Sequence, residues 1–204
     1  MKFIKYLLCV TVLLPFTTYA NPASDQLANL LQSTQTVSAN FTQTVFDGSG
    51  RVINKSTGQF CLQKPNKFRW QVNSPIKQFV ISDGTQLWNY QPDLEQVTVQ
   101  AVSTGVQATP LAILGGSTKA LTTNFTITEQ AGDSYQLVAK EKGNFTKVLL
   151  MFNGSAIKQM DLYDTMGQKT ELTFANIQTN ASIAAKQFQF TPPKGVDVID
   201  GFAN

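Results

Sequence analysis

The chain has 204 residues, of which 42% are hydrophobic and 14% are charged, with 16 Lys+Arg against 13 Asp+Glu. This balance favours a folded globule over a disordered chain. The basic residues form no cluster of the kind that marks a nucleic-acid binder. The absence of His excludes a Ser-His-Asp triad, a Cys-His pair and a His-ligated zinc site.

The first twenty residues have the pattern of a secretory signal. Lys2 and Lys5 precede an apolar run at residues 6–16, and a small residue stands at the expected cleavage point. The run is too short for a transmembrane helix. We therefore expect residues 1–20 to be removed during export, leaving a single domain over residues 21–204. Without its two signal lysines, the mature chain has 14 basic and 13 acidic residues, a net charge of +1.

Residues 22–34 have the pattern of an amphipathic helix. Pro22 suits the first turn of a helix, where its missing N–H is not needed. Leu27, Leu30 and Leu31 follow at the spacing i, i+3, i+4, which places them on one face. We expect these three leucines to be the apolar contact residues of a lid over a ligand cavity.

From Val37 onward the hydrophobic period changes to two, which is typical of β-strands. The turn-forming residues 47–50 predict a hairpin onto residues 51–63. Short spacers without a strand–helix alternation predict an antiparallel sheet, and about a dozen strands are expected to curl into a barrel or a strongly bent sheet. The further strand-like runs are 67–73, 78–82, 86–90, 95–100, 125–129, 135–140, 147–152, 156–163, 171–177 and 188–190.

Residues 101–123 interrupt this alternation. Pro110 marks a helix start, and paired glycines shortly after it mark a stop. The pattern predicts a helix of one to two turns that is apolar nearly all round, and Leu111, Ile113 and Leu114 are its expected contact residues. Two short apolar helices over a large curled sheet could cover a cavity for an aliphatic ligand.

The sequence gathers no catalytic or metal-binding groups. The carboxylates are scattered and lie mostly at turns, and Asp161 and Asp164 lack the spacing of a calcium loop. Cys61 lies in a strand-like run and is interpreted as a buried packing residue rather than a nucleophile. We expect no catalytic residue, no metal site and no cofactor, although a hydrolase with a carboxylate pair stays open as an alternative.

Five short stretches of the chain resemble the family of periplasmic outer-membrane lipoprotein carriers, LolA. Each is weak by itself, but they fall in one order and span nearly the whole mature chain. They are Phe-Thr-Gln at 41–43, Lys-Pro-Asn-Lys-Phe-Arg-Trp at 64–70, Ser-Asp-Gly at 82–84 with Leu-Trp at 87–88, Thr-Pro-Leu at 109–111, and Phe-Thr-Pro-Pro-Lys-Gly-Val at 190–196.

The resemblance implies a mainly β fold: an incomplete antiparallel β-barrel of about eleven strands, with short α-helices forming a lid over an apolar cavity. It implies a carrier that receives acylated outer-membrane lipoproteins from an ATP-driven release complex in the inner membrane. The cargo would pass to an outer-membrane receptor without any catalysed reaction. The resemblance places Phe41, Phe68, Trp70 and Val80 at the cavity wall. We expect a monomer in the periplasm of a Gram-negative bacterium, with no nucleic-acid partner.

Lys64 departs from the family pattern, in which an Arg precedes the Pro of this motif and holds the lid closed. An ammonium group can donate to lid carbonyls but lacks the planar five-donor fork of guanidinium. We therefore expect Lys64 to act as the lid latch, with an altered balance between holding and releasing cargo. A periplasmic lipid- or glycolipid-binding sensor module of the same fold stays open as the alternative function.

Overall fold

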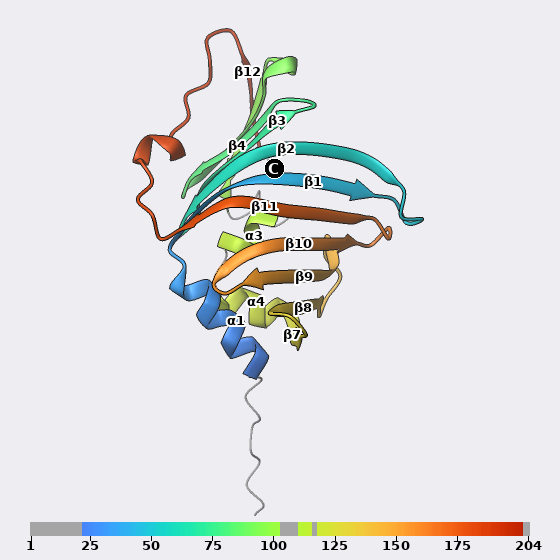
Figure 1. Cartoon of the computed structure of the whole chain (residues 1–204). Helices are drawn as coiled ribbons and strands as arrows, with labels where there is room; N and C mark the ends of the chain where they lie inside the picture. Colours follow the sequence, from blue (N-terminus) through green and yellow to red (C-terminus); the bar gives the residue numbers. More distant parts are fainter. Residues whose placement is uncertain (1–21, 103–109, 116–117, 202–204) are drawn as a thin grey trace, which may run out of the picture.

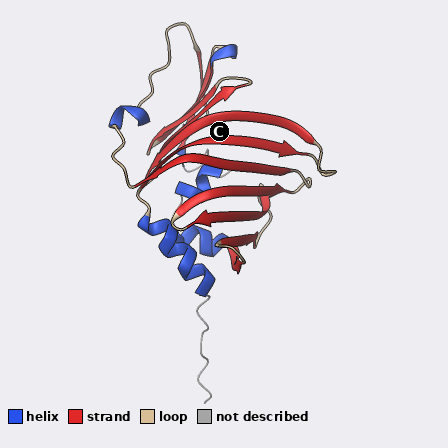
Figure 2. Ribbon diagram, viewed as in Figure 1, coloured by secondary structure: helices blue, strands red, loops and turns tan. Residues whose placement is uncertain are grey.

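The computed structural model describes residues 22–102, 110–115 and 118–201, and its dominant feature is one curved sheet of twelve strands (Figure 1). The expected mainly β fold with a few short helices is confirmed (Figure 2). The proposed signal at 1–20 lies outside the described residues. Within the ranges described, no helix is long and apolar enough to cross a membrane.

The strands match the expected runs closely, with ends within two residues for all but the last run. The elements are α1 (Pro22–Ser33), β1 (Thr36–Phe46), β2 (Val52–Gln63), β3 (Lys67–Ser74), β4 (Gln78–Asp83), β5 (Gln86–Gln91), η1 (Pro92–Leu94), β6 (Gln96–Ala101), α3 (Pro110–Gly115), α4 (Thr118–Asn124), β7 (Phe125–Gln130), β8 (Ser134–Ala139), β9 (Phe145–Asn153), β10 (Ala156–Asp164), β11 (Lys169–Thr179), η2 (Ala185–Phe188) and β12 (Asp197–Asp200).

The sheet runs in the order β12-β6-β5-β4-β3-β2-β1-β11-β10-β9-β8-β7. Consecutive strands pair as antiparallel hairpins from β1 to β6 and from β7 to β11, and the antiparallel pairing of β1 with β11 joins the two halves of the chain at the centre of the sheet. The edge strands β7 and β12 do not pair with each other, so the barrel is incomplete as expected. The pairing of β12 with β6 is parallel, which departs from the expected all-antiparallel sheet.

Three elements differ from the sequence-based expectation. The expected strand at 188–190 is wrong: Phe188 ends the 3-10 helix η2, and its buried side chain anchors this segment instead of joining a ladder. Strand β12 was not expected, because all four of its side chains are exposed and show no alternation. Helix α4 was not expected either, because Leu121 is the single large apolar residue in its seven.

The two faces of the sheet have different covers. The inner face carries α1, α3 and α4, which lie together on one side of the curved sheet in Figure 1. Residues 181–196, which we call the strap, lie along the outer face, where η2 contacts β3 and β4. Phe190 of the strap lies 5.5 Å from Tyr90 and 6.2 Å from Trp88, measured between ring centroids. Ile81, opposite Trp88 in the register, is fully buried on the same face.

Candidate functional site

The four sheet residues expected at a cavity wall lie on the inner face. Phe41, Phe68 and Trp70 are buried there, and Val80, opposite Trp70 in the register, packs against the same cluster while partly exposed. Alternation along β1 and β3 explains the placement, because residues two apart point to the same face. The structure therefore settles which strand faces meet the helices.

A row of aromatic rings crosses the middle of this inner face. Phe41 stacks on Trp70 with ring centroids 3.9 Å apart and planes at 19°. Phe60 lies 5.6 Å from Trp70 and 5.4 Å from Phe174 on β11. The row gives the inner face a broad apolar surface that spans four adjacent strands.

Gly58 makes room for this row. It lies opposite Phe41 in the register between β1 and β2. A Cβ atom at Gly58 would lie 2.5 Å from Phe41 Cζ and 2.0 Å from the backbone oxygen of Gln71. The Phe41 ring can reach Trp70 because it passes over a residue without a side chain, which is a common reason for Gly inside a strand.

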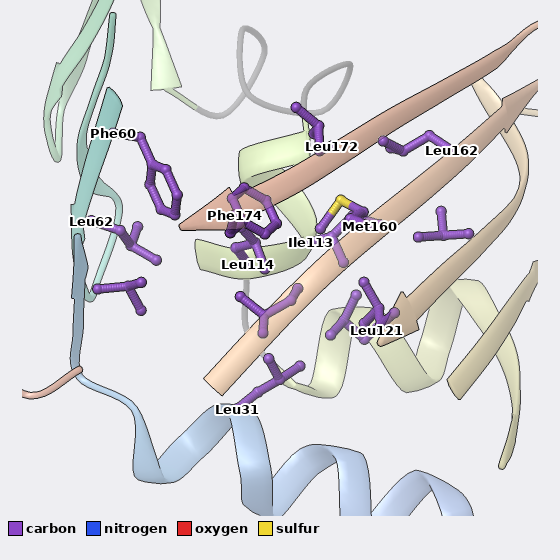
Figure 3. Close-up of a cluster of buried hydrophobic side chains, with 14 of the residues drawn as sticks. Leu31, Phe60, Leu62, Ile113, Leu114, Leu121, Met160, Leu162, Leu172 and Phe174 are labelled. Carbon is purple, nitrogen blue, oxygen red and sulfur yellow. The ribbon is translucent and has the colours of Figure 1, made fainter. Parts of the chain in front are cut away.

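The apolar residues of the helices belong to the same buried cluster as the aromatic row. Leu27, Leu31, Ile113 and Leu114 are buried in one cluster with the sheet residues, and Leu30 packs against it while partly buried. Figure 3 shows Leu114 beside Phe174 and Ile113 beside Met160, with Leu31 reaching from α1 into the same cluster. The side chain of Leu111 lies outside the described part of the chain.

An apolar hollow of about 20 Å³ lies where α1 and α3 meet the sheet. Its size is that of roughly one water molecule. Six of its lining residues are apolar, and they come from the two helices and from the sheet. The hollow therefore marks the contact between the helices and the sheet, which we call the seam. The lining residues are Leu30, Leu31, Thr34, Val37, Lys64, Leu114, Phe152, Ser155, Ile157 and Thr179.

Lys64 is placed at this seam, between β2 and β3. Its Nζ donates a hydrogen bond to the backbone oxygen of Leu31, and its backbone N–H donates to the oxygen of Gln35 at 2.9 Å. The last turn of α1 contains no basic residue of its own, so Lys64 brings a cation to the negative end of the helix from outside. Burial lowers the pKa of Lys64 below its ordinary value of 10.5.

Sequence reasoning missed several residues of the inner face. Phe60 and Phe174 belong to the aromatic row, and Tyr135 and Phe152 form an edge-to-face pair at 5.9 Å nearer the β7 edge. Each of them lies in a strand that was expected, so alternation was available as a signal. The missing information was the phase, because alternation does not say which of two faces meets the helices.

The other reactive groups lie away from the inner face. Cys61 was expected to be buried, but it is only partly buried, because its strand turns it to the outer face opposite Arg69. Burial still raises the pKa of the Cys61 thiol above 9.0, although the nearby Arg69 charge acts against this shift. Asp161 is buried and accepts a hydrogen bond from Gln159 at 2.8 Å. Among the described residues, no group of three or more Cys, Asp or Glu is placed to hold a metal ion.

A family model and curated relatives match most of the chain, and they carry the same description. The family model described as "Outer membrane lipoprotein carrier protein LolA" matches residues 32–191. A relative from Methylococcus capsulatus is 42% identical over 180 residues, covering 86% of each chain, and one from Chromohalobacter salexigens is 36% identical over 206 residues, covering 98% of each. Both are named outer-membrane lipoprotein carrier protein.

One solved structure has a similar fold despite low sequence identity. It is an uncharacterized conserved protein from Thermus thermophilus, with a TM-score of 0.56 and 12% identity. The match covers 87% of this chain and 98% of that chain. The fold is therefore shared across nearly the whole of that protein.

Proposed function

Because the chain belongs to the outer-membrane lipoprotein carrier family LolA, we propose that it carries acylated lipoproteins, with the acyl chains bound between the inner face of the sheet and the helices. The supporting observation is that helix leucines and sheet aromatics share one buried cluster. An acyl chain reaches those rings when the helices move away, so the helices act as a lid. This role requires binding and release, and no bond of the cargo is made or broken.

The acyl site and lid that we propose combine residues from the sheet and from two helices. Phe41, Phe68, Trp70 and Val80 form the wall, and Lys64 is the latch that holds the end of α1. The lid residues are Leu27, Leu30, Leu31, Leu111, Ile113 and Leu114.

Energetics favours a route between two membranes for such a carrier. Burying an acyl chain gains about 0.8 kcal/mol per CH₂ relative to water, but almost nothing relative to a bilayer, which is equally apolar. Loading from a membrane therefore needs an external energy source, for which we propose an ATP-driven release complex in the inner membrane. Unloading needs only an outer-membrane receptor that binds the acyl chains more tightly. A difference of about 1.4 kcal/mol in binding free energy changes the ratio of receptor-bound to carrier-bound cargo tenfold.

A route between the two membranes runs through the periplasm of a Gram-negative bacterium, where we propose that the protein acts. We propose that it does so as a monomer. The apolar run that follows Lys2 and Lys5 supports export, with cleavage of residues 1–20. The mature chain, residues 21–204, would then act as a single carrier domain.

The function is tested by release of a triacylated lipoprotein from spheroplasts of a Gram-negative strain depleted of its own carrier. We expect the purified mature protein to release the lipoprotein as a soluble one-to-one complex. Lys64→Arg is compared in the same assay and measures the effect of Lys64 on the lid. If neither form releases the lipoprotein while an established carrier does, the carrier proposal fails and the lipid-sensor alternative gains.

A further inference from the structure

The last turn of α1 leaves four backbone carbonyls without partners inside the helix, as every helix does. Two of them are satisfied locally. The oxygen of Leu30 accepts from Ser33 Oγ at 2.9 Å, and that of Gln32 accepts from Gln35 Nε2 at 2.9 Å. These donors belong to the end of the helix and to its linker, so they can move together with α1.

The other two carbonyls are held from the sheet. Leu31 O accepts from Lys64 Nζ, beside a longer bond of 3.4 Å from the Thr34 N–H, and Ser33 O accepts from Asn180 Nδ2 at 3.0 Å. Asn180 directly follows β11, whereas Lys64 connects β2 to β3. The end of α1 is thus bound on two sides, by side chains that come from opposite neighbours of β1.

Asn180 uses both ends of its carboxamide. While Nδ2 donates to the helix, Oδ1 accepts from the backbone N–H of Gln35 in the linker at 2.8 Å. Its backbone N–H donates to the oxygen of Thr36 at 2.9 Å, and Thr36 Oγ1 donates to Ala181 O at 2.7 Å. Asn180 has a φ of +57°, a left-handed conformation that Asn tolerates better than most residues.

In the linker between α1 and β1, the backbone N–H and the backbone oxygen of Gln35 both have hydrogen-bond partners on the sheet. Gln35 donates its N–H to Asn180 and accepts from the backbone N–H of Lys64 at its oxygen. We propose that Asn180 is a second latch of the lid: a positioning residue that, together with Lys64, holds the end of α1 against the sheet. The inference rests on the proposed function, in which α1 is part of the lid.

The two proposed latches, Lys64 and Asn180, hold the end of α1 by different chemistry. The Lys64 ammonium is a charge at the negative end of a helix, whereas the Asn180 carboxamide is neutral and joins helix and linker at once. When α1 moves away from the sheet, the hydrogen bond from Asn180 to Ser33 has to break even if the bond from Lys64 to Leu31 is already broken. Asn180→Asp keeps the acceptor for Gln35, but it loses the donor to Ser33 and adds a negative charge beside the negative helix end. That variant should therefore open more readily than Asn180→Gly.

The chain offers a matched control in Asn176. It lies on β11, is exposed, has a φ of +53°, and its side chain makes no hydrogen bond within the described residues. Asn180→Gly and Asn176→Gly remove the same side chain from the same kind of backbone conformation without strain. A difference between them reports the contacts to α1 and its linker.

The test is hydrogen exchange of the mature protein, followed by mass spectrometry of peptides from α1, β1 and β11. We expect Asn180→Gly to speed exchange in α1 about five- to tenfold, since two exposed hydrogen bonds are lost. Asn176→Gly should leave α1 at the wild-type rate, and β1 and β11 should be unchanged in both variants. In the double variant Lys64→Met, Asn180→Gly, hydrogen exchange in α1 should be faster than in either single variant.

Two results would overturn the latch. One is α1 exchange in Asn180→Gly no faster than in Asn176→Gly. The other is equal acceleration of α1, β1 and β11, which would make Asn180 a support of the sheet. Binding of a dansylated long-chain fatty acid is measured on the same samples. If the wild type does not bind this probe, the carrier function fails while the exchange data still decide the latch.

Discussion

At the scale of single residues, the inner face depends on close fits that a substitution can disturb. The stacking of Phe41 on Trp70 requires a neighbour with no side chain, and Gly58 provides it. Latching likewise depends on individual groups, because the last carbonyls of α1 need donors from outside the helix. Hydrophobicity alone would give a packed core, but these fits decide where the rings and the helix end lie.

Gly58→Ala is expected to lower the free energy of unfolding by about 1–3 kcal/mol or more, because its Cβ would overlap the Phe41 ring and a backbone oxygen. Urea unfolding followed by tryptophan fluorescence measures the change. Gly143→Ala is the control, since a Cβ there meets nothing within 4 Å. Equal stability of the two variants would contradict the proposed role of Gly58.

At the scale of elements, some of the strands are joined by turns that a side-chain carboxylate stabilises. In the β1–β2 turn, Asp47 accepts from the backbone N–H groups of Ser49 and Arg51, at 3.0 Å each. In the β4–β5 turn, Asp83 accepts from Thr85 and Gln86 at 2.8 and 2.9 Å. Such Asp residues fix the hairpin register, and with it the set of side chains that reaches the inner face.

Asp83 gives the β4–β5 turn a dependence on acid. Burial raises the pKa of Asp83, but hydrogen bonds from Gln86 and Thr85 outweigh it and hold the pKa below its ordinary 3.8. The contribution of this carboxylate to stability is therefore present above pH 3.8 and is lost as the pH falls through the lower folded-state pKa.

Asp83→Asn should consequently reduce the difference in urea midpoint between pH 6 and pH 3, because Asn does not titrate. Asp93→Asn is the control, since the Asp93 side chain makes no hydrogen bond or ion pair in the described structure. An acid response in Asp83→Asn as large as in the wild type and in the control would show that the turn does not contribute.

At the scale of the whole molecule, the sheet is covered on both faces by segments that come from different parts of the chain. The helices cover the inner face, and the strap brings Phe188 and Phe190 onto the outer face. Beyond the strap, β12 ends the sheet as a four-residue edge strand with Asp197 and Asp200 exposed. Short, charged edge strands are a common protection against edge-to-edge association.

Phe188→Ala should lower the free energy of unfolding by about 3–5 kcal/mol, because it removes a side chain that is only 2% exposed. Phe190→Ala should cost less, since Phe190 is only partly buried. Urea unfolding of both variants provides the measurement. A loss at Phe188 no larger than that at Phe190 would show that the strap does not depend on this anchor.

The sequence by itself determined the mainly β fold, the positions of strands β1 to β11, helix α1, the short helix around Ile113 and the family resemblance. These features follow from local signals: hydrophobic period, turn residues and helix start residues. Tertiary structure alone decided the phase of alternation, the presence and parallel pairing of β12, helix α4 and the contacts of Asn180 with α1 and its linker. The physical reason is that these features depend on partners far apart in the chain, such as Asn180 and Ser33, whose approach no local pattern records.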